Sequence, residues 1–126
     1  MQLDYIDHYN EYDDNIVRLY DFDMAEANKF RQIVQQSILV NMKTLNLASI
    51  DFIDARNCNL TLRISEEDEG ITTEDNIEFY CDLTIKGYQQ MIILLEQFCS
   101  KETKGYQFLY DIDSHTDFLF SPAGTW

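Results

Sequence analysis

Two segments of this chain read alike although they lie in different halves of it. DDNIVRLYDFD occupies 13–23 and EDNIEFYCDLT occupies 74–84, sixty-one residues further on. Each begins with carboxylates, continues as a run that suits a strand, and ends on a residue that caps helices well, Asp23 or Thr84. Agreement of caps and element order at one fixed offset is typical of an internal repeat.

An amphipathic helix is expected directly after each of these segments. Over 24–45 and over 85–101, apolar residues recur at the three- and four-residue spacing that forms one helical stripe. Asp23 and Glu26 form a capping-box pattern, and Thr84 is a natural cap for the second helix.

Strand patterns follow each expected helix. Residues 60–64 alternate between apolar and polar side chains, and 50–55 is expected to be their hairpin partner. Residues 106–112 also alternate, and 118–120 are expected to pair back with them. The acidic stretch SEEDEGITTED at 65–75 is interpreted as the loop between the halves.

These patterns predict a single α+β domain spanning 1–126, with halves of about 1–64 and 65–126. Each half reads strand, helix, strand, strand. We expect the two helices to pack on one face of a mostly antiparallel sheet of six or seven strands. Each half alone is too short to bury its own sheet face, so the chain is not divided into two domains.

Net charge is the second property of the sequence that limits what the chain can bind. The 126 residues carry 23 acidic and 9 basic side chains, a formal charge of -14. Such a chain repels nucleic-acid phosphates and anionic membranes and attracts basic proteins. Three cysteines without a CxxC pair, an acidic N-terminus and the lack of a long apolar run predict a cytoplasmic protein with reduced thiols. We interpret it as a protein of the bacterial cytosol type.

The acidic residues are concentrated in two blocks. Residues 1–23 hold seven against Arg18, and residues 65–83 hold eight with no base. One interpretation is a solvated surface that keeps the protein soluble. The other is a docking face for a basic partner, in which tyrosines add contact area. The partner-binding candidates are Tyr9, Tyr12, Asp13, Asp14, Glu66, Glu67, Asp68 and Glu69.

The segment DIDSHTD at 111–117 suggests a different chemistry. Asp111, Asp113, His115 and Asp117 alternate, so an extended chain would place a set of metal ligands on one face. It does not fit a calcium-binding EF-hand loop, because the sixth position is Thr rather than Gly and the twelfth is Pro rather than Glu. The alternative interpretation is a polar hairpin turn.

The sequence contains no recognisable catalytic signature, phosphate-binding glycine loop or basic aromatic patch. We therefore expect a small non-enzymatic binding module without a cofactor. One concrete form is an inhibitor or immunity-type protein that engages a basic partner. A metal-dependent enzyme or metal-binding protein built on 111–117 is the alternative. A homodimer that uses an exposed sheet edge is a third hypothesis.

Overall fold

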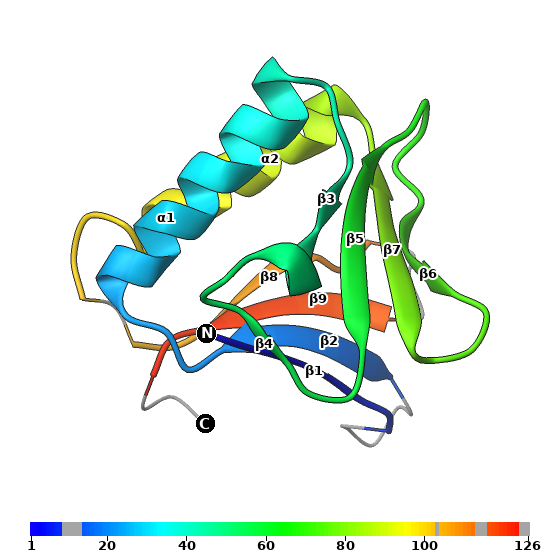
Figure 1. The fold of residues 1–126 in the computed structure, drawn as a ribbon, viewed down its shortest axis with the longest axis horizontal. Coiled ribbons are helices and arrows are strands. Elements are labelled where there is room, and N and C mark those ends of the chain that lie inside the picture. Colours follow the sequence, from blue (N-terminus) through cyan, green and yellow to red (C-terminus); the bar gives the residue numbers. More distant parts are fainter. Residues whose placement is uncertain (9–13, 103, 113–115, 124–126) are drawn as a thin grey trace.

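The computed structural model describes residues 1–8, 14–102, 104–112 and 116–123, and over these residues the chain is α+β, as expected (Figure 1). Two α-helices and nine strands lie in the described ranges. In chain order they are β1 (Gln2–Ile6), β2 (Asn15–Tyr20), α1 (Met24–Val34), β3 (Leu45–Asn46), β4 (Asp54–Ala55), β5 (Asn59–Ile64), β6 (Gly70–Thr73), β7 (Glu78–Leu83), α2 (Ile85–Glu96), β8 (Gln107–Tyr110) and β9 (Thr116–Ser121).

The strands form two sheets. Sheet A has the order β4-β1-β2-β9-β8, and sheet B has the order β3-β5-β7-β6. Both are mixed, because β2 runs parallel to β9 and β5 runs parallel to β7. The prediction of one mostly antiparallel sheet of six or seven strands is therefore wrong. Side-chain alternation shows that a strand has a buried face, but it does not show which sheet the strand joins.

Each sheet draws strands from both halves of the chain. Sheet A combines β1, β2 and β4 with β8 and β9, whereas sheet B combines β3 and β5 with β6 and β7. The strands of sheet B run across those of sheet A, and the two helices lie side by side over the remaining side of the molecule (Figure 1). One hydrophobic cluster joins all of these layers, with fully buried members that include Leu19, Phe30, Leu62, Tyr88 and Phe118.

Both helices begin where their caps predict. The Asp23 carboxylate accepts a hydrogen bond from the Glu26 amide at 2.8 Å, and the Glu26 carboxylate accepts one from the Asp23 amide at 3.3 Å. The Thr84 hydroxyl accepts a hydrogen bond from the Gly87 amide at 3.0 Å. None of the helices in the described ranges is long and apolar enough to cross a membrane.

Both helices end earlier than predicted. The first continues past α1 as a π-helical turn, η1 (Gln35–Val40), and then stops. Met42 has a φ of 55°, which turns the chain so that Leu45 enters β3 instead of extending the helix. The helix α2 stops at Glu96. Apolar periodicity continued beyond both ends because Leu45 and Phe98 remain in the core after the helices have stopped.

The segment 50–55 does not form the predicted hairpin partner of β5. That partner is β3, and the chain between them forms a 3-10 turn, η2 (Leu47–Ser49), followed by β4, which pairs in parallel with β1. Leu47, Ile50 and Ile53 are all buried at a spacing of three, which suits a tight turn better than an alternating strand.

Two further strand predictions have different outcomes. The predicted loop at 65–75 contains β6, whose Ile71 is buried against the core. A single apolar residue between acidic neighbours was too weak a signal for a strand. The pairing of 118–120 with the preceding strand is confirmed, because β8 and β9 are antiparallel.

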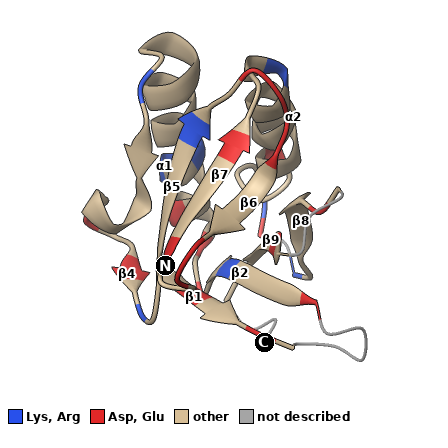
Figure 2. Cartoon of the chain, turned by 90° about the vertical axis from the view of Figure 1, so that its right-hand side faces the viewer, with Lys and Arg blue, Asp and Glu red and all other residues tan. Residues whose placement is uncertain are grey.

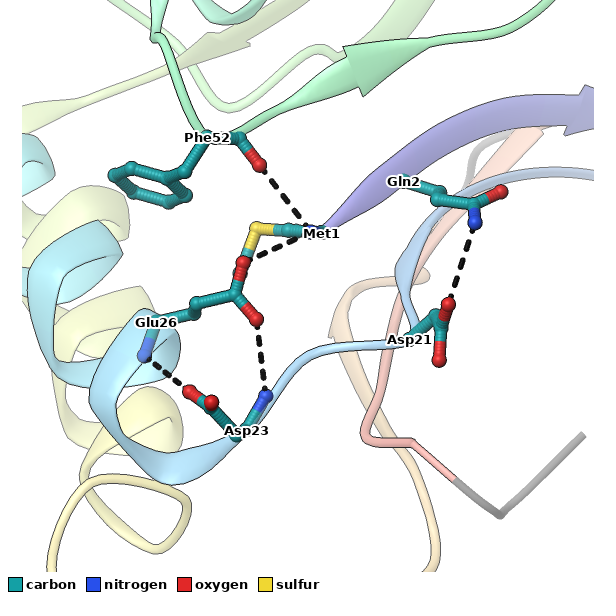
Figure 3. Close-up of polar contacts among 6 residues, drawn as sticks. All are labelled: Met1, Gln2, Asp21, Asp23, Glu26 and Phe52. Carbon is teal, nitrogen blue, oxygen red and sulfur yellow. Dashed lines mark hydrogen bonds and ion pairs between the residues drawn. The ribbon is translucent and has the colours of Figure 1, made fainter.

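The start of the chain is tied to the first helix cap (Figure 3). The amino group of Met1 lies 2.9 Å from a carboxylate oxygen of Glu26 and 3.2 Å from the carbonyl oxygen of Phe52. The Asp21 carboxylate accepts a hydrogen bond from the side-chain amide of Gln2 at 3.2 Å, and Asp21 itself has a φ of 57°. These contacts agree with an architectural role for Asp21 at the end of β2.

Candidate functional site

The outward face of sheet B is polar because β7 alternates strictly. Phe79, Cys81 and Leu83 are buried in the core, so Glu78, Tyr80 and Asp82 point to the opposite face. The register then sets rows across the sheet: Asn59 is level with Glu78, Thr61 with Tyr80 and Thr72, and Arg63 with Asp82.

The arginine on this face, Arg63, is already paired with a carboxylate. The Arg63 guanidinium donates to both carboxylate oxygens of Asp82, at 2.7 and 2.8 Å, and lies 4.0 Å above the centre of the Tyr80 ring. The hydrogen bond to Asp82 raises the pKa of Arg63. Asp82 is only 7% exposed, so this bidentate pair belongs to the framework of the sheet. The Arg63 charge is therefore used by Asp82 and does not neutralise the other carboxylates around it.

Acidic segments lie at both ends of the edge strand β6 (Figure 2). The segment 66–69 precedes it, and the segment 74–78, which consists of the turn 74–77 and the first residue of β7, follows it. We call these two segments with β6 the acidic edge. Within the described part of the chain, its exposed glutamates form no ion pair; these are Glu66, Glu67, Glu69, Glu74 and Glu78.

The turn between β6 and β7 is held by its own side chains. The Asp75 carboxylate accepts hydrogen bonds from the amides of Ile77 and Glu78, at 3.0 and 2.9 Å. These bonds lower the pKa of Asp75, because they favour its charged form. The Thr73 hydroxyl donates to the carbonyl oxygen of Glu78 at 2.8 Å, and Asn76 has a φ of 59°. The turn therefore presents Glu74 on a fixed backbone.

A groove of about 490 Å³ opens on the outward face beside this turn. Its walls are Arg63, Thr72, Thr73, Glu74, Asp75, Glu78 and Tyr80. Three carboxylates and one paired guanidinium line it, so the groove suits a cationic side chain better than an anion.

Asp68 differs from the other predicted binding residues, because its carboxylate is used internally. The same oxygen accepts from the Thr84 amide and from the Thr84 hydroxyl, each at 2.8 Å. The Asp68 carbonyl oxygen accepts from the Tyr110 hydroxyl at 3.1 Å. Asp68 thus supports the start of α2, whereas Glu66, Glu67 and Glu69 are exposed on the same loop.

The first acidic block is only partly described. Tyr9, Tyr12 and Asp13 lie outside the described residues. Asp14 is half-buried immediately before β2, which belongs to sheet A rather than to sheet B.

The predicted metal segment is also only partly described. Asp111 is exposed just after β8, and Asp117 is half-buried on β9, the neighbouring strand. Asp113 and His115 lie outside the described residues. Over the described ranges, no group of three or more histidine, cysteine or acidic side chains is placed to hold a metal ion.

The three cysteines are free thiols, and Cys58 and Cys81 are buried. Burial raises the pKa of each of these two to about 12. Burial also raises the pKa of the half-buried Cys99. A raised pKa disfavours the thiolate, which is the nucleophilic form of cysteine.

Sequence reasoning missed Glu74 and Glu78 as individual site residues, although it counted them within the second acidic block. The signal was the alternation of Glu78, Tyr80 and Asp82 along β7, which places the three on one face. Comparisons with known protein families, with curated proteins and with solved structures find no match to this chain.

Proposed function

We propose that this chain is a small non-enzymatic, cytoplasmic protein-binding module whose acidic edge engages a basic surface of another protein. The observation that carries the proposal is the placement of unpaired, exposed glutamates at both ends of one edge strand, around a face whose arginine is already neutralised by Asp82. Clustered carboxylates of this kind steer a basic partner and orient it on the surface.

The groove beside the β6–β7 turn gives the partner a specific chemistry. A lysine or arginine side chain entering it would meet Glu74 and Glu78, with the fixed Asp75 carboxylate at its wall. An inhibitor of a cationic nuclease or toxin works in this way when its carboxylates occupy positions meant for phosphates. An inhibitor or immunity-type role is therefore the concrete form of the proposal.

The test is capture of the partner from native lysate by the immobilised protein, followed by affinity measurement with charge variants. We expect capture to weaken as NaCl rises from about 0.05 M to about 0.5 M, because the Debye length falls below the spacing of exposed charges. The triple variant Glu66→Gln/Glu67→Gln/Glu69→Gln should reduce affinity at least tenfold, about 1.4 kcal/mol. Asp68 is left intact so that α2 keeps its support.

The matched control neutralises three exposed acidic residues away from the acidic edge: Asp7→Asn, Asp51→Asn and Glu96→Gln. It changes the net charge by the same amount. Affinity that falls equally in both triple variants, or that does not depend on salt, contradicts a specific acidic edge.

A metal-binding role for 111–117 is the second candidate. The observation in its favour is that the β8–β9 hairpin brings Asp111 and Asp117 to the two sides of one turn. A thermal-shift screen with Mg²⁺, Mn²⁺, Ca²⁺ and Zn²⁺ tests it, because a metal that binds the folded state raises the melting temperature. A shift that disappears in Asp111→Asn supports this candidate, and no shift with any of the four ions removes it.

We also propose that the two halves are equivalent units that have exchanged strands. Support comes from matched pairing: β1–β2 and β6–β7 are antiparallel, β2–β9 and β7–β5 are parallel, and β9–β8 and β5–β3 are antiparallel. The caps Asp23 and Thr84 take corresponding places before α1 and α2. The test is to superpose residues 1–64 on residues 65–126 in an independently determined structure, so that β1, β2, α1, β3 and β5 are compared with β6, β7, α2, β8 and β9. Poor overlap of the two helices would contradict the proposal.

A further inference from the structure

The strand β8 forms an edge of sheet A that lies below a helix. It is placed beyond β9 at the outer side of the sheet, with α2 above it (Figure 2). The opposite edge strand of sheet A, β4, and the edge strand β3 of sheet B have two residues each. In β6, the other edge strand of sheet B, Gly70 and Ile71 are buried. This leaves β8 as the edge to which a further strand can be added.

A groove of about 530 Å³ separates β8 from α2. Its strand side consists of the consecutive residues 107–112, which are β8 and the two residues after it. Consecutive side chains of a strand point to opposite faces, so an unbroken run shows that the groove follows the backbone edge of β8. Its helix side consists of Lys86, Gly87, Gln90 and Leu94, which lie on one face of α2.

The dimensions of the groove suit an extended segment. Residues 107–112 span about 20 Å in extended conformation, and α2 covers about 12 Å of this length from Lys86 to Leu94. An added strand of about four residues therefore fits between the strand and the helix. Such a strand pairs with β8 through its backbone and places alternate side chains against α2.

The edge already forms the kind of hydrogen bond that an added strand makes. The side-chain amide of Gln107 donates to the carbonyl oxygen of Phe108 at 2.9 Å, and its oxygen accepts from the side-chain amide of Gln97 at 3.1 Å. The Phe108 carbonyl therefore accepts from an amide that is not part of the β8–β9 ladder. The backbone N–H of an incoming strand is a donor of the same kind.

The pairing of β8 with β9 is interrupted by a bulge. The register passes from Phe108–Leu119 to Tyr110–Phe118, which makes Leu109 the extra residue. The extra residue of a bulge is left out of the ladder, so its backbone groups can pair elsewhere. A segment lying along the groove is placed to use them.

Apolar side chains line much of the groove. Leu94, Phe108 and Tyr110 are half-buried along it, and Leu109 is buried. Ile112 is 64% exposed, which is high for a large aliphatic side chain. Apolar side chains of an added strand would cover these residues and remove them from water.

The groove is close to electrically neutral, in contrast to the acidic edge. The Asp68 carboxylate in its lining is already engaged by the amide and the hydroxyl of Thr84. Lys86 and Asp111 contribute one charge of each sign. A segment without net charge therefore suits this groove, whereas a basic surface is attracted more strongly to the acidic edge.

We propose that the groove between β8 and α2 binds an extended, uncharged segment of a partner protein, which joins sheet A as a strand next to β8. Its backbone pairs with the edge of β8, and its alternate apolar side chains pack against Leu94 and Leu109. The proposal does not depend on the acidic edge, which lies on the other sheet and calls for a basic partner.

Selection of random linear peptides displayed on phage tests the proposal. Peptides of about seven residues are long enough to span the groove. We expect enriched sequences to alternate apolar residues and to lack charge. Fluorescence anisotropy of a synthetic enriched peptide should show an affinity that changes less than about twofold between about 0.05 M and about 0.5 M NaCl. Enrichment of no peptide, or only of basic peptides that bind in a salt-dependent way, overturns the proposal.

N-methylation of the peptide backbone distinguishes strand addition from other modes of binding. Only every second residue of an added strand directs its N–H group to β8. A methyl group on those nitrogens should weaken binding about tenfold or more, and a methyl group on the intervening nitrogens should have little effect. Equal sensitivity at all positions, or at none, contradicts pairing with the edge of β8.

A pair of matched variants locates the binding site. Gln90→Trp fills the groove from the helix side and should weaken peptide binding about tenfold or more. The control Gln89→Trp changes the adjacent exposed position of α2, outside the lining, and should bind the peptide as the unmodified protein does. Circular dichroism melting checks that both variants are folded. Equal affinities of the two variants for the peptide overturn the proposal.

Discussion

At the residue scale, Glu26 combines two roles that are usually separate. Its carboxylate completes the cap of α1 by accepting from the Asp23 amide, and it also lies 2.9 Å from the buried amino group of Met1. Glu26→Ala removes both contacts and should lower the free energy of unfolding by about 1–2 kcal/mol. Glu26→Gln keeps a side chain that can cap but removes the charge, and should cost about half as much. Urea denaturation measures both, and equal losses would show that the charge contributes nothing.

The buried thiols make stability depend on alkaline pH. Cys58 and Cys81 have their pKa raised to about 12 by burial, from an ordinary value of 9.0. Burial also raises the pKa of Tyr88, whose hydroxyl donates to the carbonyl oxygens of Arg63 and Cys81. Above pH 9 the unfolded chain loses these protons first, so it binds fewer protons than the folded chain and stability falls as pH rises.

We therefore expect the urea midpoint to decrease steadily between about pH 9 and pH 12. The variant Cys58→Ala removes one of the titrating groups and should give a shallower decrease. A midpoint that stays constant or rises over this range would contradict burial of these thiols. At neutral pH, the half-buried Cys99 should react with a thiol reagent faster than the buried Cys58 and Cys81, but still slowly, because its own pKa is also raised by burial.

At the element scale, the start of α2 depends on a residue outside the helix. Asp68 accepts two hydrogen bonds from Thr84, and a Cβ atom added to Gly87 would lie 2.7 Å from the same Asp68 oxygen. Gly87→Ala would ordinarily stabilise a helix by about 1 kcal/mol. Here we expect it to destabilise the protein by about 1 kcal/mol or more, because it displaces Asp68.

A double-mutant cycle isolates this effect. In the Asp68→Ala background the displaced carboxylate is absent, so Gly87→Ala should be neutral or stabilising, with a coupling energy of at least about 1 kcal/mol. The contact of the new Cβ with Leu83, at 3.1 Å, is the same in both backgrounds and cancels in the cycle. Additive effects of the two substitutions would show that Asp68 does not exclude the methyl group.

The sequence predicts helix starts better than strand partners because caps are local. Asp23, Glu26 and Thr84 bond to residues three positions away, so their patterns can be read along the chain. One neighbour of β5 in its sheet is β7. One neighbour of β2 is β9, which lies far from β2 along the chain. No local pattern specifies such pairs.

The acidic edge was predicted only in part, because only part of it is local in sequence. Glu66, Glu67 and Glu69 are neighbours in sequence, whereas the groove beside Glu78 and Tyr80 depends on the register between strands.

At the scale of the whole molecule, charge divides the surface into regions with different expected partners. Carboxylates surround β6 on sheet B (Figure 2), whereas α1 and α2 carry exposed charges of both signs, at Lys29, Lys86 and Glu96. A basic partner is therefore expected to meet the molecule at β6 rather than at α1 or α2.

The presence of strands from both halves in each sheet predicts how the molecule responds to being cut. A protease site inserted between Glu66 and Glu67 falls in an exposed loop, and it leaves Asp68 in place beside α2. Cleavage there separates β1–β5 from β6–β9, but each sheet still needs strands from both fragments. We therefore expect the fragments to stay together on gel filtration and to unfold in one cooperative transition. Each purified fragment alone should lack that transition, because strands of both sheets and part of the common core would be missing. If either fragment instead unfolds cooperatively by itself, the halves are separate folding units and the parallel pairs β2–β9 and β5–β7 are not what unites the fold.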